Sequence, residues 1–362
     1  MDLKNIVTHF SISEEVVEIK PLGTGLINDT YLVRTSPAAA QDYVLQRINH
    51  AIFKDVELLQ RNIQRITDHI RHKLQQANAN DVDRKTLTLV AARDGQLFYF
   101  DGENYWRITR FIDGSKTYEQ VTPEFAFLTG QAFGEFQYLL SDLGGEPLGA
   151  TIPDFHNMEF RLHQLREAIG VNPVKRLAKV QAIVDELLLR AEDMCKAERL
   201  YREGKLPKRI THCDTKVNNM LFDEEDHFLC VIDLDTTMPG FVLSDFGDFI
   251  RTAANTGAED DEDLSRVGVN MDIFKSFARG YLQSARPFLT TTEIENLPYG
   301  AQLLTYMQTV RFLTDYINGD TYYKIKYPDH NLQRTLAQLT LLHSIDAHLN
   351  EMNTFIKQFS NH

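Results

Sequence analysis

A dense polar cluster separates two apolar stretches near the middle of the chain. The segment RITHCDTKVNNMLF, residues 209–222, places His212, Asp214, Lys216 and Asn219 in an HxDxKxxN pattern. Polar side chains at this density are unsuited to a hydrophobic core, so we expect them to bind other polar groups. A carboxylate beside a bound phosphate can accept a hydroxyl proton, and a nearby lysine can steady that phosphate. The spacing therefore favours phosphoryl-transfer chemistry.

A short hairpin is expected directly after this cluster. The apolar runs MLF and FLCVI are separated by the turn-forming stretch DEEDH. Asn219 precedes the first run and Asp233 follows the second, so paired strands about 5 Å apart bring the two residues to one end. Amide and carboxylate oxygens are the ligands that Mg²⁺ prefers. We expect a metal site there, with Asp235 either holding a second Mg²⁺ or beginning the next turn.

Each of these polar residues also has a simpler interpretation. Asp214, Asn219 and Asp233 are all of types common in turns and caps. That interpretation accounts for each residue singly but not for their joint spacing around a hairpin.

The periodicity of the hydrophobic residues changes along the chain, near residue 112. Between about residues 16 and 112, short β-type runs alternate with turn signals such as RDG and DGEN, and one amphipathic helix interrupts them at 56–76. From residue 121 onward helical periodicity dominates. We expect an N-terminal lobe at 1–112, with the glycine loop and a nucleotide-binding sheet, and a C-terminal helical lobe at 113–362, with the catalytic loop, metal site and substrate pocket. Helices are predicted in the second lobe at about 123–140, 176–200, 271–285, 292–318 and 331–358.

Composition narrows the class of protein. The chain has 362 residues, 43% of them hydrophobic and 25% charged, and a net charge of −13. These values are ordinary for a globular protein, and the acidic balance argues against binding to nucleic acid or to anionic membranes. No apolar run reaches about 18 residues, and the first residues lack a signal-peptide pattern. Three cysteines without a CxxC pair suggest neither a disulfide framework nor a zinc site. We expect a soluble cytoplasmic protein; its oligomeric state is left open.

The motifs resemble those of a known family. HxDxKxxN followed by a hairpin and IDxD is similar to the catalytic loop and metal-binding aspartate of the protein-kinase fold, in the branch of the aminoglycoside phosphotransferase and choline kinase family. The similarity to N-acetylhexosamine 1-kinases of that family extends from the glycine loop to about residue 340. The stretches that carry it are LQRIN, THCDTKVNN, IDLDTTMPG, DFGDFIR, RFLTDYINGDTYY and KYPDHNL. The resemblance implies an α+β, protein-kinase-like fold with a small β-rich N-lobe and a larger helical C-lobe.

Roles for the central cluster follow from this resemblance. It implies ATP and Mg²⁺ as cofactors, with Asp214, Lys216 and Asn219 as catalytic residues and Asp233 with Asn219 as the metal site. His212 is expected to be structural. By its order in the chain, Asp245 of DFGDFIR is expected to brace the catalytic loop.

The N-terminal segments are expected to hold the nucleotide, in the cleft between the lobes. The stretch PLGTGLINDTYLV contains Gly23, Gly25 and Asn28, which are suited either to covering phosphates with backbone N–H groups or to shaping an ordinary hairpin. The third strand, YVLQRIN, has Gln46 where the kinase pattern has a phosphate-binding lysine, and Arg47 follows. Adjacent strand residues point to opposite faces, so which of the two replaces the lysine is left open.

A hinge and an acceptor pocket complete the expected site. WRITRFIDG fits the hinge between the lobes, and the three residues expected to meet adenine are Arg110, Phe111 and Ile112. In RFLTDYINGDTYY, Arg311 and Asp315 lie four residues apart on one helix face, which is equally the spacing of a surface ion pair. The resemblance assigns Arg311 and Tyr322 to the sugar pocket, and we expect Asp315 and Asp214 to bind the acceptor as well.

The expected function is a kinase that phosphorylates the anomeric hydroxyl of GlcNAc or GalNAc to the sugar 1-phosphate. The preference between these sugars is open. The alternatives are another kinase of the same branch, acting on an aminoglycoside, choline or homoserine, or a nucleotide-binding module without catalysis, which the missing lysine motivates. Nucleic acid and membrane are not expected partners.

Overall fold

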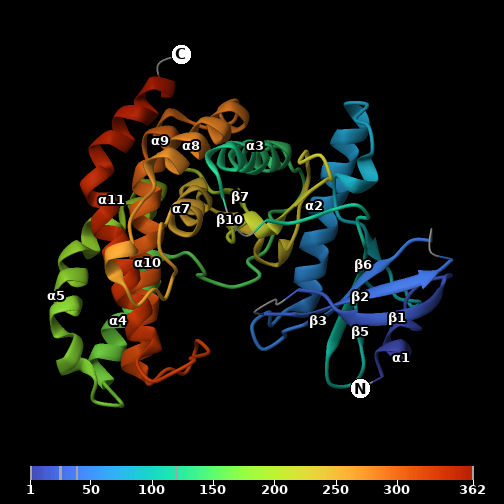
Figure 1. Cartoon of the computed structure of the whole chain (residues 1–362), viewed down its shortest axis with the longest axis horizontal. Coiled ribbons are helices and arrows are strands. Elements are labelled where there is room, and N and C mark those ends of the chain that lie inside the picture. Colours follow the sequence, from blue (N-terminus) through green and yellow to red (C-terminus); the bar gives the residue numbers. More distant parts are fainter. Residues whose placement is uncertain (1, 24–26, 38–39, 119–120, 361–362) are drawn as a thin grey trace. The chain divides into compact units, whose positions relative to one another are not determined.

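The computed structural model describes residues 2–23, 27–37, 40–118 and 121–360 (Figure 1). The chain divides into two compact units. The first consists of Met1–Thr117, Asp142–Pro153 and Asn218–Met238, and the second of Tyr118–Ser141, Asp154–Val217 and Pro239–His362. A single boundary after residue 112 did not anticipate the two later segments of the first unit. One of these segments, Asn218–Met238, contains both expected metal ligands. It belongs to the first unit because Leu229 and Cys230 of its hairpin pack with Ile112 in one apolar cluster.

An antiparallel sheet forms the body of the first unit, with strand order β1-β2-β3-β6-β4 and β5 paired with β6. Figure 1 shows the long strands in blue beside helix α2. Its strands are β1 (Glu15–Pro21), β2 (Asp29–Ser36), β3 (Tyr43–Ile48), β4 (Leu89–Val90), β5 (Tyr99–Phe100) and β6 (Tyr105–Arg110), and its helices are α1 (Leu3–Val7), α2 (Val56–Gln76) and the 3₁₀ turn η1 (Val82–Arg84).

The register of β3 and β6 gives this sheet two unlike faces. Leu45 lies opposite Ile108, and both belong to the apolar core that also holds Trp106. Gln46 lies opposite Arg107, one residue out of phase and therefore on the other face. Arg107 is only 4% exposed, so this second face is polar and yet buried.

The predicted hairpin is confirmed. Strands β8 (Met220–Phe222) and β9 (Phe228–Val231) pair antiparallel, and the 3₁₀ turn η3 (Leu234–Thr236) follows them. At the open end, the Ile232 N–H donates to the Asn219 carbonyl at 2.9 Å. The residue before the first strand and the residue before Asp233 are thus joined by a backbone hydrogen bond, as the strand spacing requires.

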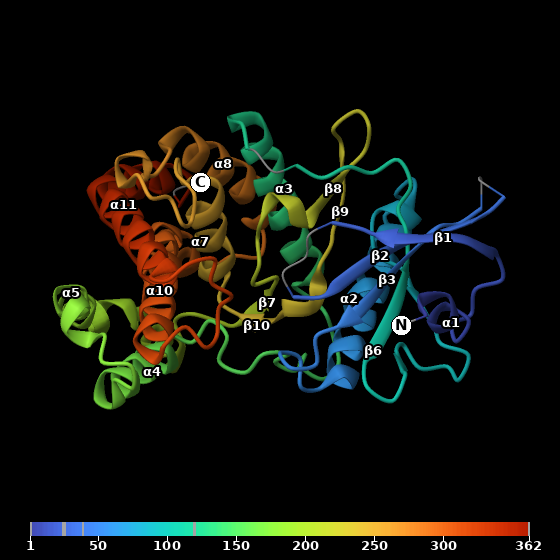
Figure 2. The ribbon, with the colours of Figure 1, turned by 60° about the horizontal axis from the view of Figure 1, so that its bottom comes forward.

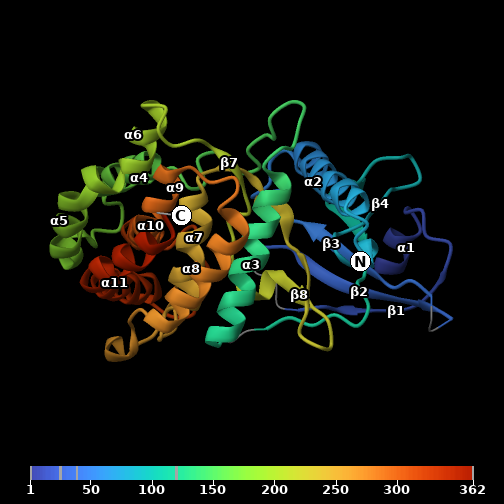
Figure 3. The same cartoon turned by 90° about the horizontal axis from the view of Figure 1, so that it is seen from above.

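The second unit is built mainly of helices (Figure 2). Figures 2 and 3 both show α10 and α11 running side by side. The helices are α3 (Pro123–Leu140), α4 (Met158–Val171), α5 (Leu177–Met194), α6 (Lys196–Arg202), α7 (Val242–Ala253), α8 (Met271–Ala285), α9 (Thr291–Glu295), α10 (Leu297–Asn318) and α11 (His330–Ser360), with 3₁₀ turns η2 (Val217–Asn219) and η4 (Leu264–Arg266) and the paired strands β7 (Arg209–Thr211) and β10 (Met238–Gly240).

Glycine allows α7 to lie directly against α10. A Cβ atom at Gly247 would come within 2.0 Å of the Gly300 carbonyl oxygen, so neither position leaves room for a side chain. This contact fixes the helix whose acidic residues bind the backbone of the loop at 212–215. Within the described ranges, no helix has the length and apolar character that a membrane crossing requires.

The helix predictions are confirmed for α2, α3, α8 and α11 and need correction for the segments 176–200 and 292–318. The helix expected at 176–200 is interrupted at Cys195, where α5 ends and α6 begins. The helix expected at 292–318 is interrupted at Asn296, and Pro298 lies in the first turn of the second piece, where its missing N–H costs no helical bond. Helices α1, α4 and α7 were not predicted.

Candidate active site

The expected catalytic loop, in the second unit, pairs two of the predicted residues. Lys216 Nζ lies 2.7 Å from Asp214 Oδ1. Burial acts to lower the pKa of Lys216, but the negative charges of Asp214 and Asp248 outweigh it and raise this pKa above its usual value. The lysine therefore stays protonated, and a permanent cation lies beside the carboxylate.

Asp245, in the first turn of α7, holds the start of this loop. Its carboxylate accepts the backbone N–H groups of His212 and Cys213, both at 2.8 Å, and the side-chain amide of Gln137 at 2.6 Å. Burial raises the pKa of Asp245 to about 6, against the lowering effect of His212 and these hydrogen bonds. Cys213 has a φ of +63°, a conformation that is costly for a residue with a Cβ and is held here by Asp245. The expectation that Asp245 braces the loop is confirmed.

Asp248, one turn further along α7, holds the middle of the loop. It accepts the Thr215 N–H at 3.1 Å and binds Arg251 at 2.8 Å. Burial acts to raise its pKa, but Arg251 and Lys216 together lower it. The sequence interpretation missed Asp248, although the three-residue spacing of Asp245, Asp248 and Arg251 in DFGDFIR places them on one helix face.

His212 has a packing role, as expected. Its side chain is fully buried, and its ring meets the rings of Phe133 and Phe136 edge-on, with centroids 5.7 and 6.0 Å away. Its Nδ1 accepts the Asp214 N–H at 3.3 Å. The residue supports the backbone next to Asp214.

Replacing Asp245 by asparagine tests the bracing role. The amide can accept only one of the two loop N–H groups, and its own N–H₂ faces the other, so we expect the free energy of unfolding to fall by roughly 1–3 kcal/mol. Turnover should fall with it, because Asp214 loses its fixed position. Chemical denaturation and steady-state kinetics measure both, with the exposed Asp193→Asn as control. Unchanged stability in Asp245→Asn would contradict this role.

The predicted metal ligands both belong to the first unit. Asn219 is 7% exposed, and Asp233 stands at the start of η3 with a φ of +58°. An amide oxygen and a carboxylate suit Mg²⁺, which is commonly held by one or two carboxylates together with phosphate and water oxygens. In the parts of the chain that the structure describes, no three His, Cys, Asp or Glu side chains form a metal-binding group. A metal held by this pair would take its remaining ligands from phosphate and water oxygens.

Asp235 lies in a buried network of the first unit. It is 2% exposed, its Oδ1 accepts from Arg107, and its Oδ2 accepts from Asn28 Nδ2 at 2.6 Å. Its backbone carbonyl accepts the Thr151 hydroxyl at 2.7 Å. Both carboxylate oxygens thus bind protein donors, which favours the alternative in which Asp235 belongs to the turn η3 and holds no second metal.

The residues predicted to hold the nucleotide have varied environments. Gly25 lies outside the described residues, and Gly23 has a φ of +72°, which favours glycine. Asn28 donates to Asp235, and its Oδ1 accepts the Asn49 N–H at 2.9 Å. Both side-chain groups of Asn28 therefore connect parts of the first unit.

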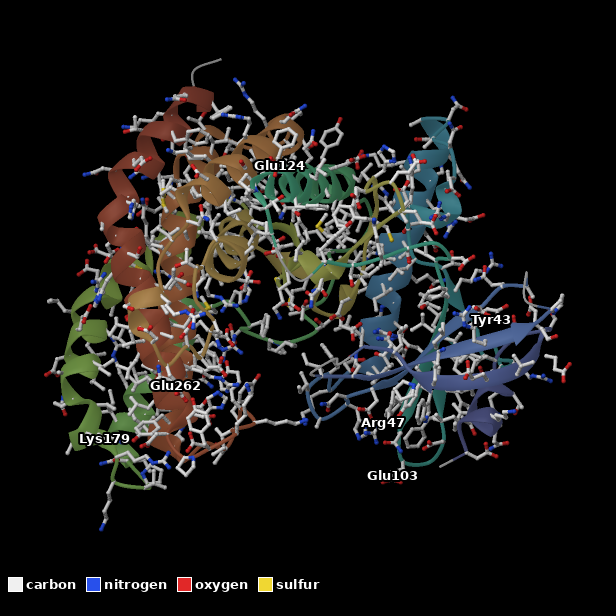
Figure 4. The ribbon with its side chains drawn as sticks, in the orientation of Figure 1. Tyr43, Arg47, Glu103, Glu124, Lys179 and Glu262 are labelled. Carbon is white, nitrogen blue, oxygen red and sulfur yellow. The ribbon has the colours of Figure 1, made fainter. Side chains whose placement is uncertain are left out.

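Arg47 and Gln46 point to different surroundings. The Arg47 side chain is 42% exposed and is paired with Asp29, near the turn that carries Glu103 (Figure 4). Gln46 Nε2 donates to Thr30 Oγ1 at 3.1 Å, and its Oε1 accepts from Arg107 Nε at 2.9 Å. Of the two, Gln46 alone belongs to the buried polar face.

The expected hinge begins where β6 ends, at Arg110. The Phe111 N–H donates to the Asp42 carbonyl at 2.9 Å, and the Phe111 carbonyl accepts from Gln41 Nε2 at 2.9 Å. Ile112 is 6% exposed. The backbone of Phe111 is therefore tied to the start of β3.

A cavity of about 350 Å³ lies in the second unit, between α4, the end of α10 and the segment after it. Arg311 is placed among aromatic rings, with its guanidinium carbon 5.2 Å from the centroid of Phe155 and 6.0 Å from that of Tyr322. Tyr322 is 62% exposed, so its ring is accessible. The residues lining the cavity include Arg161, Gln164, Arg311, Asp315, Tyr322 and Tyr323.

Asp315 shapes the wall of this cavity. Its Oδ1 accepts the Tyr322 N–H at 2.8 Å and its Oδ2 accepts the Tyr323 N–H at 2.9 Å, while Asn331 Nδ2 donates to Oδ2 at 2.9 Å. The surface ion pair with Arg311 that its spacing allowed is not formed within the described residues; Arg311 donates to Gln308 instead. Asp315 thus positions Tyr322 and is itself only 4% exposed.

Arg161 of α4 is a cavity residue that the sequence interpretation missed. Burial and the neighbouring charge of Arg311 lower its pKa to about 10. Its helix could have been found from Leu162, Leu165 and Ala168, which have helical spacing and are all buried.

Comparison with known proteins identifies the family. The sequence profile of the phosphotransferase enzyme family (APH) matches residues 18–269, more than half of the chain. The chain belongs to the phosphotransferase enzyme family. The expectation from the motifs is confirmed at this level.

Solved structures of such phosphotransferases have a similar fold. An aminoglycoside phosphotransferase from Alicyclobacillus acidocaldarius aligns with a TM-score of 0.61 at 12% identity, over 99% of this chain and 97% of that one. A choline kinase from Cryptosporidium parvum aligns with a TM-score of 0.58 at 14% identity, over the whole of both chains. The amicoumacin kinase hAmiN aligns with a TM-score of 0.55 at 13% identity, over 99% and 92%. The protein-kinase-like fold, with a β-sheet lobe and a helical lobe, is therefore confirmed.

Proposed function

We propose that this phosphotransferase transfers the γ-phosphate of ATP to the anomeric hydroxyl of an N-acetylhexosamine, GlcNAc or GalNAc, and so forms the sugar 1-phosphate. The observation that carries the proposal is the cavity in which Arg311 and Tyr322 meet. Its volume of about 350 Å³ lies at the small end of the range for ligand pockets and suits one sugar ring.

The cavity offers the contacts that a hexosamine needs. Arg311 presents fixed N–H donors to ring hydroxyls or to the acetamido carbonyl. Tyr322 offers a flat face to the pyranose and a hydroxyl for hydrogen bonding. Asp315 keeps Tyr322 in place through its N–H, and we assign Asp315 this positioning role.

The chemical step rests on the loop of the second unit. The Asp214 carboxylate takes the proton of the acceptor hydroxyl as that oxygen bonds to the γ-phosphorus and the bond to the ADP oxygen breaks. Lys216, held protonated beside Asp214, steadies the phosphate charge. Asn219 and Asp233 are the proposed Mg²⁺ ligands, and bound Mg²⁺ would neutralise charge on the phosphate oxygens.

We propose that the first unit holds the nucleotide. The glycine segment from Gly23 to Asn28 would cover the phosphates, and the backbone at Arg110–Ile112 would meet adenine. The structure of the amicoumacin kinase hAmiN, which has a similar fold, is a complex with AMP-PNP and Ca²⁺, and this supports ATP and a divalent cation as cofactors here.

The wall of the cavity is close to charge-neutral. Arg161 and Arg311 line it together with Glu167 and Asp315, and this balance suits an uncharged sugar. A homoserine kinase remains the second candidate within the family, because those arginines could bind a carboxylate. A non-catalytic module is disfavoured by the intact set of Asp214, Lys216, Asn219 and Asp233.

Replacing Arg311 by alanine tests the acceptor site. We expect the KM for the hexosamine to rise roughly 10- to 100-fold, the effect of losing a charged hydrogen bond, while the KM for ATP stays within about twofold. The measurement is ADP release with GlcNAc, GalNAc, choline, homoserine and an aminoglycoside, together with assignment of the phosphorylated position. Arg202→Ala is the control, since this arginine pairs with Glu159 at the surface. An unchanged hexosamine KM, or phosphate on carbon 6, would rule out this acceptor model.

A further inference from the structure

The nucleotide-binding sheet lacks a lysine at the usual place. In protein kinases a lysine on the third strand contacts the nucleotide phosphates and pairs with a carboxylate. Here β3 has Gln46 at that place, and the neighbouring Arg47 lies on the opposite face, paired with Asp29 and 42% exposed. Neither residue of β3 therefore brings a positive charge to the buried polar face.

Arg107 on the adjacent strand β6 does bring one. It is the register partner of Gln46, so the two side chains leave the sheet side by side on the same face. Arg107 Nε donates to Gln46 Oε1 at 2.9 Å, and Gln46 Nε2 donates in turn to Thr30 Oγ1 at 3.1 Å. This chain of hydrogen bonds crosses three strands and fixes the plane of the guanidinium.

The carboxylate partner is Asp235. Arg107 Nη1 donates to its Oδ1, and the two side chains are 5% and 3% exposed. Asn28 Nδ2 donates to the other carboxylate oxygen at 2.6 Å, so Asp235 is itself held in place. The pair has the charges of a lysine–glutamate pair, but the cation comes from β6 and the anion from the turn after the hairpin.

One N–H₂ group of the Arg107 guanidinium is not used in these contacts. Arg107 uses Nε for Gln46 and Nη1 for Asp235, and among the described residues Nη2 has no hydrogen-bond partner. Nη2 is not a fully buried atom, so this donor of an otherwise buried guanidinium can be reached by a further acceptor. A phosphate oxygen is well matched to it, because charge-assisted hydrogen bonds from arginine to phosphate are short and strong.

We propose that Arg107 replaces the third-strand lysine and contacts the phosphates of the bound nucleotide through Nη2, with Gln46 and Asp235 as the residues that position it. The proposal rests on the proposed binding of ATP to the first unit. It also gives Asp235 a role that does not require a second metal.

The test compares a nucleotide with phosphates and one without, using Arg107→Gln. We expect the affinity for Mg·ADP to fall roughly 10- to 100-fold, as for loss of a charged hydrogen bond, and the affinity for adenosine to stay within about twofold. Calorimetry and competition binding on the full chain measure both without any acceptor. Arg61→Gln is the matched control, since Arg61 is exposed on α2 of the same unit and forms only a 3.8 Å contact with Glu57.

A second variant covers the risk that Arg107→Gln does not fold, since it leaves Asp235 buried without its cation. In Gln46→Lys/Arg107→Gln the charge moves from β6 to β3 on the same face, and we expect Mg·ADP affinity to return to within about fivefold of the wild type. Equal losses for ADP and adenosine in whichever variant folds, or no loss of ADP affinity in Arg107→Gln, would overturn the proposal. Wild-type protein that binds no Mg·ADP would instead reject the proposed nucleotide function itself.

Discussion

Asp214→Asn is expected to lower kcat by roughly 10²–10⁴, the usual contribution of a positioned general base, while Mg·ADP affinity stays within about twofold. Asparagine keeps the shape of the side chain and can still accept the hydrogen bond from Lys216, which lies 2.7 Å from Asp214 in the wild type. It cannot take the proton of the acceptor hydroxyl. The loss should therefore appear in turnover and leave nucleotide binding largely unaffected.

Steady-state kinetics and calorimetry on the same preparations separate these two effects. Asp193→Asn is a matched control, because that aspartate is exposed on α5 of the same unit. Melting temperatures establish that the catalytic loop of Asp214→Asn remains folded. A kcat close to that of the wild type would show that another group accepts the proton.

Asp233→Asn is expected to remove the dependence of nucleotide affinity on Mg²⁺ and to lower turnover on the order of 10³-fold, because a metal ion contributes several kcal/mol of charge stabilisation during phosphoryl transfer. Asparagine is a better substitution than alanine at this position. Asp233 has a φ of +58°, which asparagine tolerates and alanine does not, so backbone strain adds little to the effect.

The measurement is calorimetric titration of ADP with Mg²⁺ and with EDTA. In the wild type we expect the two affinities to differ, and in Asp233→Asn we expect them to coincide. Asp226→Asn is the control from the turn of the same hairpin, where Asp226 forms a surface pair with Lys116. A preserved Mg²⁺ effect in Asp233→Asn would exclude this residue as a ligand.

Local sequence determined the hairpin and the residues at its open end. The pattern MLF–DEEDH–FLCVI is short and contiguous, and two strands joined by a turn can pair in few ways. The hydrogen bond between Ile232 and Asn219 follows from that pairing. The bracing role of Asp245 was also predictable, since its motif stood in a known order relative to the catalytic loop.

Helix boundaries were less predictable. Periodicity continues through Cys195, so the pattern gave one helix where the backbone forms α5 and α6. Helix α7 was not predicted because its buried face carries Asp245, Asp248 and Arg251. Charged residues at these positions do not follow the apolar pattern that indicates the buried face of a helix. Their burial is favourable only because the loop N–H groups and the ion pair satisfy them.

The chain by itself determined the type of chemistry, because the groups around Asp214 lie within a few residues of one another and their spacing survives in any fold that forms the hairpin. Only the tertiary structure decided where positive charge resides on the buried polar face of the sheet in the first unit. Arg107 and Asp235 are 128 residues apart, and no periodicity relates them. Their pairing depends on the register that sets Gln46 opposite Arg107, and on the return of the 218–238 segment to the first unit. Such a contact depends on how distant segments pack, and a single sequence carries no local signal of that packing.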